Sequence, residues 1–153
     1  MINFRKISLF LGLILITNCG YTPLIDSKNN NFFLSNLTLE GDRQINNYIT
    51  NGLKKFQEKR ENAKKYNVEI ISEYIKNISN KDDKGNPKNY TIKTVISVKL
   101  TSEEGNVIER AFERSTTLSA KDKKIEEKEL ENKYKKDLSN LLSQDIIFLL
   151  RNQ

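Results

Sequence analysis

The sequence predicts an α+β domain in which two helices pack on one face of a four-stranded, mostly antiparallel sheet, in the order β-α-β-β-β-α. Three observations lead to this fold class. Apolar and polar residues alternate over 90–100, as in a strand with one wet face, and apolar residues recur every three or four positions over 42–56 and again over 130–150. The 153 residues contain no internal repeat and no domain boundary, so we expect one domain.

The first strand and helix are predicted over residues 32–56. Leu37 and Leu39 alternate with polar neighbours in a strand over 32–40. Gly41 and Asp42 interrupt that pattern, and the Asp42 carboxylate is suited to cap the first helix. The residues expected on the buried face of that helix are Ile45, Ile49, Leu53 and Phe56.

Three further strands are predicted over 68–78, 90–100 and 107–118. The apolar phase of the 68–78 segment shifts between Ile70 and Ile71, which predicts a β-bulge there. A loop rich in Lys, Asp, Gly and Pro follows over 80–89, and residues 103–106 have the composition of a hairpin turn. The apolar face of the 90–100 strand consists of Tyr90, Ile92, Thr94, Ile96, Val98 and Leu100.

A long terminal helix of about 27 residues is predicted after Ser119, because Ser119 is followed three residues later by Asp122, as in a capping motif. Its apolar positions are Leu130, Tyr134, Leu138, Leu141, Leu142, Ile146, Leu149 and Leu150. The apolar run 146–150 is wider than one helix stripe. One side is expected in the core, and the other is expected either there too or in contact with a partner.

The composition excludes several kinds of chemistry. With no His and one Cys, the chain cannot form a Ser-His-Asp or Cys-His centre, a His/Cys zinc site or an intrachain disulfide. The acidic pairs Asp82-Asp83 and Glu103-Glu104 fall in expected loops, where carboxylates stay solvated and retain ordinary acidity. We therefore expect neither an enzyme nor a cofactor-binding protein.

The net charge of +6 comes largely from lysine. Nucleic acid is not an expected partner, because the six Arg are scattered from Arg5 to Arg151 and form no patch. Lysines gather over 54–65, around the loop 80–89 and over 121–124. Each group is interpreted either as a solvated surface or as a site for the phosphates of an anionic lipid.

The N-terminus has the three parts of a secretory signal: the cations Arg5 and Lys6, a short apolar run over 7–16, and a polar segment that ends at Cys19. The run is shorter than the roughly 20 residues that cross a bilayer. The single Cys lies where cleavage is expected, so Ile16-Thr17-Asn18-Cys19 resembles a bacterial lipobox, whose Cys carries acyl chains. An ordinary secretory signal with an incidental thiol is the alternative.

Three segments follow from this interpretation. Residues 1–18 form a lipoprotein signal peptide, residues 19–31 carry the lipidated Cys19 and a flexible tether, and residues 32–153 form the α+β domain. Gly20 after the Cys, where Asp would favour retention at the inner membrane, resembles an outer-membrane address. We therefore expect the protein to be lipid-anchored on the periplasmic face of the outer membrane.

Four segments, in this order, resemble the lipopolysaccharide-assembly lipoprotein family, LptE, in its alphaproteobacterial form. They are Cys19-Gly20-Tyr21-Thr22-Pro23-Leu24; Leu37 to Arg43 followed by Leu53; Tyr90 to Leu100 with Ile108 to Phe112; and Ala120-Lys121-Asp122 before the last helix. Together they span most of the chain after Cys19.

The resemblance implies an outer-membrane lipoprotein that forms a plug-and-barrel complex with the β-barrel LptD and binds lipopolysaccharide on its way to the outer leaflet. It implies no enzymatic activity. By position, Lys84 in the loop between the second and third strands and Lys121 before the last helix match family positions implicated in lipopolysaccharide contact. The alternative is a lipid-anchored scaffold or auxiliary protein of another envelope complex, which uses the same domain without binding lipopolysaccharide.

Overall fold

The computed structural model describes residues 31–153, and the expected signal peptide, Cys19 and nearly all of the tether lie outside this range. Two helices and four strands are present in the predicted order. They are β1 (Phe32–Gly41), α2 (Arg43–Leu53) with the short 3-10 helix η2 (Lys54–Phe56), β2 (Lys64–Lys81), β3 (Pro87–Ser102), β4 (Val107–Ser119) and α3 (Lys124–Arg151).

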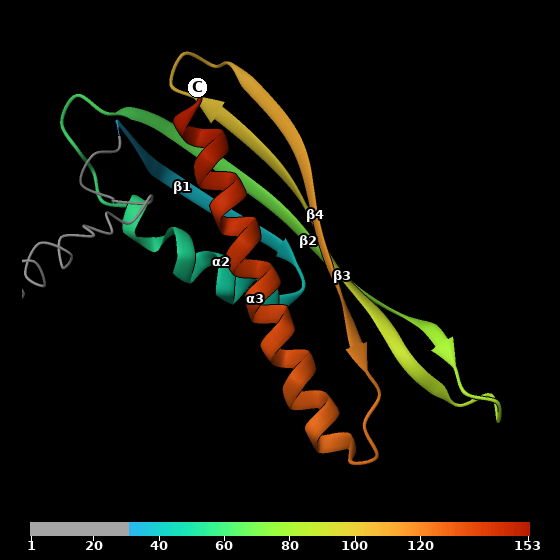
Figure 1. Cartoon of the computed structure of the whole chain (residues 1–153). Coiled ribbons are helices and arrows are strands. Elements are labelled where there is room, and N and C mark those ends of the chain that lie inside the picture. The colour runs from blue at the N-terminus through green and yellow to red at the C-terminus, as the bar shows by residue number, and fades with distance from the viewer. Residues whose placement is uncertain (1–30) are drawn as a thin grey trace, which may run out of the picture.

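The four strands form one sheet in the order β1-β2-β3-β4, shown in Figure 1. β2, β3 and β4 form an antiparallel meander, whereas β1 pairs with β2 in parallel. The parallel pairing follows from the chain path, because α2 and η2 carry the chain back to the end of the sheet where β1 began. The expectation of a mostly antiparallel α+β sheet is confirmed.

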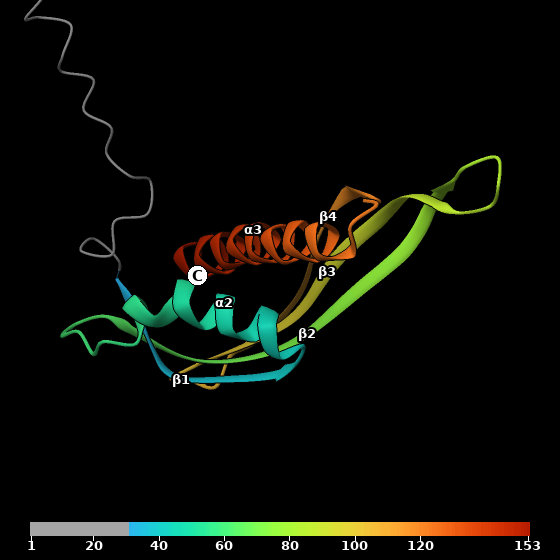
Figure 2. The ribbon, with the colours of Figure 1, turned by 90° about the horizontal axis from the view of Figure 1, so that it is seen from below.

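Both helices lie on the same side of the sheet, as Figure 2 shows. The core lies between the two layers, and the largest fully buried side chains include Ile45 and Ile49 from α2, Leu142 and Ile146 from α3, and Ile70, Ile96 and Leu100 from the sheet. Leu37 and Leu39 of β1 pack against this cluster. Within residues 31–153, no helix covers the opposite face of the sheet.

The predicted cap of α2 is confirmed. The Oδ1 atom of Asp42 accepts hydrogen bonds from the N–H groups of Gln44 and Ile45, each at 2.9 Å. Gly41 precedes it with φ +98, and a Cβ at this position would lie 1.9 Å from the carbonyl oxygen of Ser72. Only glycine can bring β1 so close to β2 and then turn into the helix.

Two local predictions were wrong. The pairing of β2 runs without a shift through Ile70 and Ile71, because Ile71 simply points to the open face, with 59% of its surface exposed. Within the described residues the bulges lie elsewhere, between Leu34 and Asn36 and near Asn80. The second error concerns α3: Ser119 stays in β4, and the N-cap of α3 is Lys123, which makes no side-chain capping bond.

The apolar stripe of α3 is largely as predicted, since Leu138, Leu142, Ile146 and Leu150 are buried. Leu141 is an exception and is exposed, as is Phe148 from the wide apolar run 146–150. The sequence did not indicate that Ser139 and Ser143 are also buried. Ser143 faces α2, where a Cβ on Gly52 would lie 2.8 Å from its hydroxyl oxygen.

Candidate functional site at the β2–β3 loop and the β4–α3 connection

Two loops that are far apart in sequence meet at one end of the molecule. The β2–β3 hairpin extends past the helices, and the chain leaving β4 turns alongside its base to enter α3 (Figure 2). The N–H of Ala120 donates to the carbonyl oxygen of Lys88 at 3.0 Å, one step beyond the paired residues Asn89 and Ser119. The structure thereby brings together the two lysine-bearing loops singled out from the sequence.

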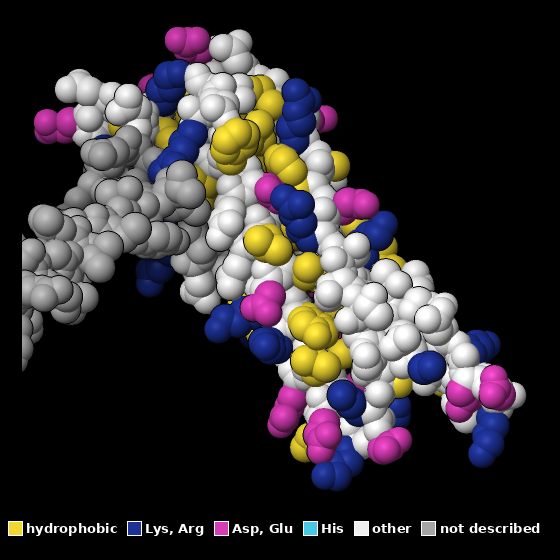
Figure 3. Space-filling model, viewed as in Figure 1, with side chains coloured by type: hydrophobic (Ala, Val, Ile, Leu, Met, Phe, Trp, Pro, Cys, Tyr) yellow, Lys and Arg dark blue, Asp and Glu magenta, His cyan; other side chains and the backbone are white. Residues whose placement is uncertain are grey.

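A recess of about 710 Å³ lies between these loops. It is lined by Lys81, Asp82, Asp83, Asn86, Pro87, Lys88, Ala120, Lys121, Asp122 and Lys124. Four ammonium groups thus face three carboxylates, and basic and acidic side chains are interspersed at this end of the surface in Figure 3. Such a recess can bind phosphate groups through lysine, but it offers no acid and base pair held apart from water.

The two predicted contact residues lie differently within this site. Lys121 lines the recess. Lys84 is exposed at the tip of the β2–β3 loop and is absent from the lining residues. Its cation adds to those at the recess, so the structure brings both predicted lysines to one end of the molecule without placing them in one cavity.

Asp82 shapes the β2–β3 loop. Its Oδ1 atom accepts hydrogen bonds from the N–H groups of Lys84 at 2.9 Å and Asn86 at 2.7 Å, and Gly85 completes the turn at φ +84. The bonds from Asn86 lower the pKa of Asp82 below its ordinary value. Asp82 and Asp83 are exposed, as predicted, but the lowered pKa of Asp82 corrects the expectation of ordinary acidity for that residue.

Glu127 fixes the β4–α3 connection. Only 6% of this residue is exposed, and its Oε2 atom accepts hydrogen bonds from the N–H of Lys121 and the ammonium of Lys124, both at 3.2 Å. Although burial disfavours ionisation, these bonds and one from Lys76 lower the pKa of Glu127. The backbone at Lys121 is therefore fixed by a buried carboxylate on the first turn of α3.

Lys76 connects this carboxylate to the sheet. Its ammonium lies 3.2 Å from Glu127 Oε1 and 2.8 Å from Glu131 Oε2, and 4.3 Å above the centre of the Tyr90 ring. Tyr74 donates a hydrogen bond to Glu131 at 2.8 Å. Burial opposes charge on these groups, but the mutual bonds raise the pKa of Lys76 and lower that of Glu131, while burial raises the pKa of Tyr74.

This network was not predicted from the sequence, although a signal was present. Lys76 continues the inward series of β2 that includes Ile70, and Glu127 and Glu131 occupy one face of α3 four residues apart. A cation and two anions on facing inner surfaces indicate a partly buried ion pair. Recognising the pair requires knowing that the start of α3 lies against β2 near Lys76. The sequence pattern of the strand and that of the helix, each taken alone, do not show this.

Comparisons with known proteins support the fold. No family model and no curated protein matches the chain. Among solved structures, several bacterial lipoproteins have a similar fold. Rare lipoprotein B from Shewanella oneidensis matches with a TM-score of 0.55 at 9% identity, over 76% of this chain and 97% of that one.

Two further lipoproteins have the same fold. The match to uncharacterized lipoprotein B from Nitrosomonas europaea has a TM-score of 0.54 at 14% identity, over 78% of this chain and 81% of that one. A minor lipoprotein from Acinetobacter baumannii matches with a TM-score of 0.50 at 14% identity, over 79% and 93%. At this level of identity the likeness concerns the fold. Within residues 31–153, no helix is both long and apolar enough to span a bilayer.

Proposed function

We propose that this protein is an outer-membrane lipoprotein of the LptE type, anchored through Cys19, which plugs the β-barrel LptD and binds lipopolysaccharide during its assembly into the outer leaflet. The observation that carries the proposal is the meeting of the β2–β3 loop and the β4–α3 connection around one recess bearing Lys81, Lys88, Lys121 and Lys124. The sequence resemblance implicates these same two loops in lipopolysaccharide contact.

The chemistry of the recess supports an anionic lipid ligand. Lysine ammonium groups on exposed loops pair with phosphate as compact point charges and need no fixed fork geometry. The three carboxylates among them lower the net positive charge, so we expect lipid binding here to be reversible, as a protein that hands its ligand on requires. The shared fold with three bacterial lipoproteins is consistent with the anchor at Cys19.

The partner is tested by extraction of a natively expressed, C-terminally tagged protein from outer membranes in mild detergent, followed by mass spectrometry of what stays bound. One large β-barrel in equal amount is the expected result. A protein that emerges alone, or with cell-wall partners, would favour the scaffold alternative.

Lipopolysaccharide binding is tested by the double substitution Lys84→Glu and Lys121→Glu. We expect its affinity for purified lipopolysaccharide to fall about tenfold, because two attractive charges become repulsive. The matched control is Lys133→Glu with Lys136→Glu, which makes the same charge change at exposed positions farther along α3. Equal affinities of the two variants would remove the recess from the proposal.

A further inference from the structure

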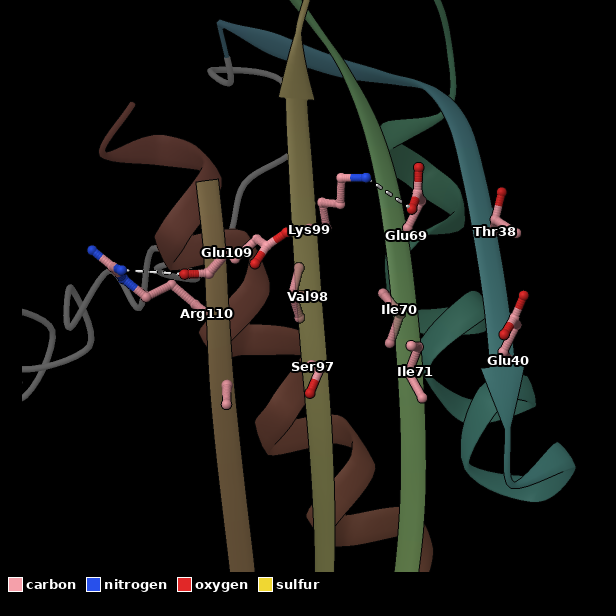
Figure 4. A pocket seen from close by; sticks show the side chains of 11 residues that line it. Thr38, Glu40, Glu69, Ile70, Ile71, Ser97, Val98, Lys99, Glu109 and Arg110 are labelled. Atoms are coloured by element: carbon pink, nitrogen blue, oxygen red, sulfur yellow. Dashed lines mark hydrogen bonds and ion pairs between the residues drawn. The ribbon is translucent and has the colours of Figure 1, made fainter. Parts of the chain in front are cut away.

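The open face of the sheet carries a groove of about 760 Å³ on the side away from both helices. Among the side chains that line it are Glu40 from β1, Ile71 from β2, Ser97 from β3 and Ala111 from β4, and Figure 4 shows how most of them are arranged. All four strands therefore contribute to one surface feature.

The strand register explains why this surface is hollow. Glu40 is paired with Ile71, Ile71 with Ser97, and Ser97 with Ala111, so these four residues form one row across the sheet. Ser97 and Ala111 are small and leave a low floor, beside which Ile71 stands 59% exposed. The row spans three strand spacings, roughly 14 Å, which matches an extended segment of about four or five residues.

The flanking rows are rich in carboxylates. Glu69 lies 3.6 Å from Lys99, and Glu113 lies 3.2 Å from Lys93, so these two charges are balanced. Glu40, Glu73 and Glu109 lie on the same face, and within residues 31–153 none of them is in an ion pair. Of these three, Glu40 and Glu109 line the groove, and Glu73 lies in the next row of the same face, where it is paired with Val95.

Arg110 does not supply the missing cation. It lines the rim, but its side chain points away from β3 beyond the outer edge of β4, as Figure 4 shows. Its Nη1 atom donates to the backbone carbonyl oxygen of Glu109 at 3.2 Å. Lys99, which is paired with Glu109 across β3 and β4, is in an ion pair with Glu69 instead. Within residues 31–153 the carboxylate of Glu109 therefore has no ion pair and is available to a cation from outside.

We propose that this groove docks an extended, basic segment of a protein partner. The segment has Lys or Arg near both ends, which pair with Glu40 on the β1 side and Glu109 on the β4 side. A small apolar side chain between them packs against Ile71. The protein that supplies this segment is the β-barrel partner, and in this respect the inference rests on the proposed function.

The charge distribution favours a polypeptide over the anionic lipid. Phosphate groups are repelled by Glu40, Glu73 and Glu109, whereas the lysine recess lies at the far end of the β2–β3 hairpin. The molecule thus presents one surface to a cationic partner and another to an anionic ligand, so both can be bound at the same time.

The groove is tested with the full-length lipoprotein in neutral detergent. The probe is a fluorescent five-residue peptide with lysine and arginine at its ends and alanine, valine and alanine between them. The triple variant Glu40→Gln, Glu73→Gln and Glu109→Gln should weaken peptide binding about tenfold. The matched control Glu61→Gln, Glu129→Gln and Asp137→Asn removes the same charge at exposed positions off this face and should bind as the wild type does.

Each result separates the two proposals. If the triple variant binds the peptide as the wild type does, the groove proposal is wrong, whatever is found for the barrel. If the wild type extracts no barrel, the proposed function fails, and the peptide assay still decides the groove. A photoreactive residue at Ile71 should crosslink to the barrel in cells, and a crosslink to lipopolysaccharide instead would overturn the docking of a basic segment.

Discussion

The ammonium of Lys76 in the second strand lies 3.2 Å from Oε1 of Glu127, which is 51 residues later on the first turn of the last helix. This ion pair ties the N-terminal end of α3 to the sheet. The same carboxylate also accepts a hydrogen bond from the N–H of Lys121, so one buried group positions both the helix and the loop that lines the recess.

Replacing Glu127 should loosen this end of the molecule. In Glu127→Ala, Lys76 keeps only Glu131 as an ionic partner, and the N–H of Lys121 loses its acceptor. We expect the free energy of unfolding to fall by about 2 kcal/mol. Urea unfolding measures this change, and Glu126→Ala, on the exposed side of the same turn, should cost less than about 0.5 kcal/mol. Equal losses for the two variants would contradict the role assigned to Glu127.

The network also predicts an acid-sensitive stability. The pKa values of Glu127 and Glu131 are lowered from an ordinary 4.5. As the pH falls, these two carboxylates are therefore protonated in the unfolded chain before they are protonated in the folded one. Their contribution is fully present above pH 4.5 and is lost as the pH falls through the lower folded values. The variant Glu127→Gln with Glu131→Gln should show a smaller acid loss when unfolding is measured from about pH 7 down to about pH 3.

The stability that the Lys76 ion pairs contribute between β2 and α3 should also be lost at alkaline pH. The pKa of Lys76 is raised above its ordinary 10.5, so its contribution persists below that pH and is lost as the pH rises through the higher folded value. In Lys76→Met this part of the alkaline loss should be absent. An unchanged alkaline profile would show that other groups dominate there.

The contact between the two helices depends on Gly52. In Gly52→Ala the new Cβ would lie 2.8 Å from the Ser143 hydroxyl oxygen and 3.0 Å from its Cβ, so we expect a loss of about 2 kcal/mol. Adding Ser143→Ala removes the closest atom and should recover part of that loss. Asn51→Ala, at an exposed neighbouring position, is the control. Strictly additive effects of the two substitutions would contradict the proposed contact.

Thr94 offers a stabilising change. It is fully buried, and its Oγ1 atom has no hydrogen-bond partner within the described part of the chain. Thr94→Val keeps the shape and removes the unpaired hydroxyl, which should raise the free energy of unfolding by about 1 kcal/mol. Thr91→Val, on the open face of the same strand, should change it little. A loss of stability in Thr94→Val would reveal a hidden partner for the hydroxyl.

The anchor is tested at Cys19. Cys19→Ser removes the thiol that the acyl chains require, so the protein should leave the membrane fraction and appear in the soluble periplasmic fraction. Metabolic labelling with a radioactive fatty acid should mark the wild type and not this variant. Labelling of both would place the lipid elsewhere, and labelling of neither would favour an ordinary secretory signal.

Much of the fold could be predicted from the sequence because the meander obeys simple periodicity. The even-numbered residues of 90–100 face the core as expected, and Asp42 caps α2. The error at Ile71 has a physical cause. An exposed isoleucine on an open sheet face has the same sequence pattern as a bulge, and only the packing layer distinguishes them.

The candidate site could be predicted only in parts. Lys121 and Lys84 stood out as members of basic loops, but their separation of 37 positions gives no sign that the loops meet. That meeting follows from the length of the β2–β3 hairpin and from the pairing of Asn89 with Ser119. The groove on the open face was beyond sequence reasoning, because its row of residues exists only once three strand registers are known.

The parallel pairing of β1 also has a consequence for the order of folding. The antiparallel strands can zip outward from the turns at Gly85 and Gly105, whereas every pair between β1 and β2 joins residues 31 or 32 positions apart. The strand that is synthesised first is therefore expected to be incorporated last. Until the meander has formed, Phe32 and Leu34 have no surface to cover them, so this interval is when the newly made chain is most prone to aggregate.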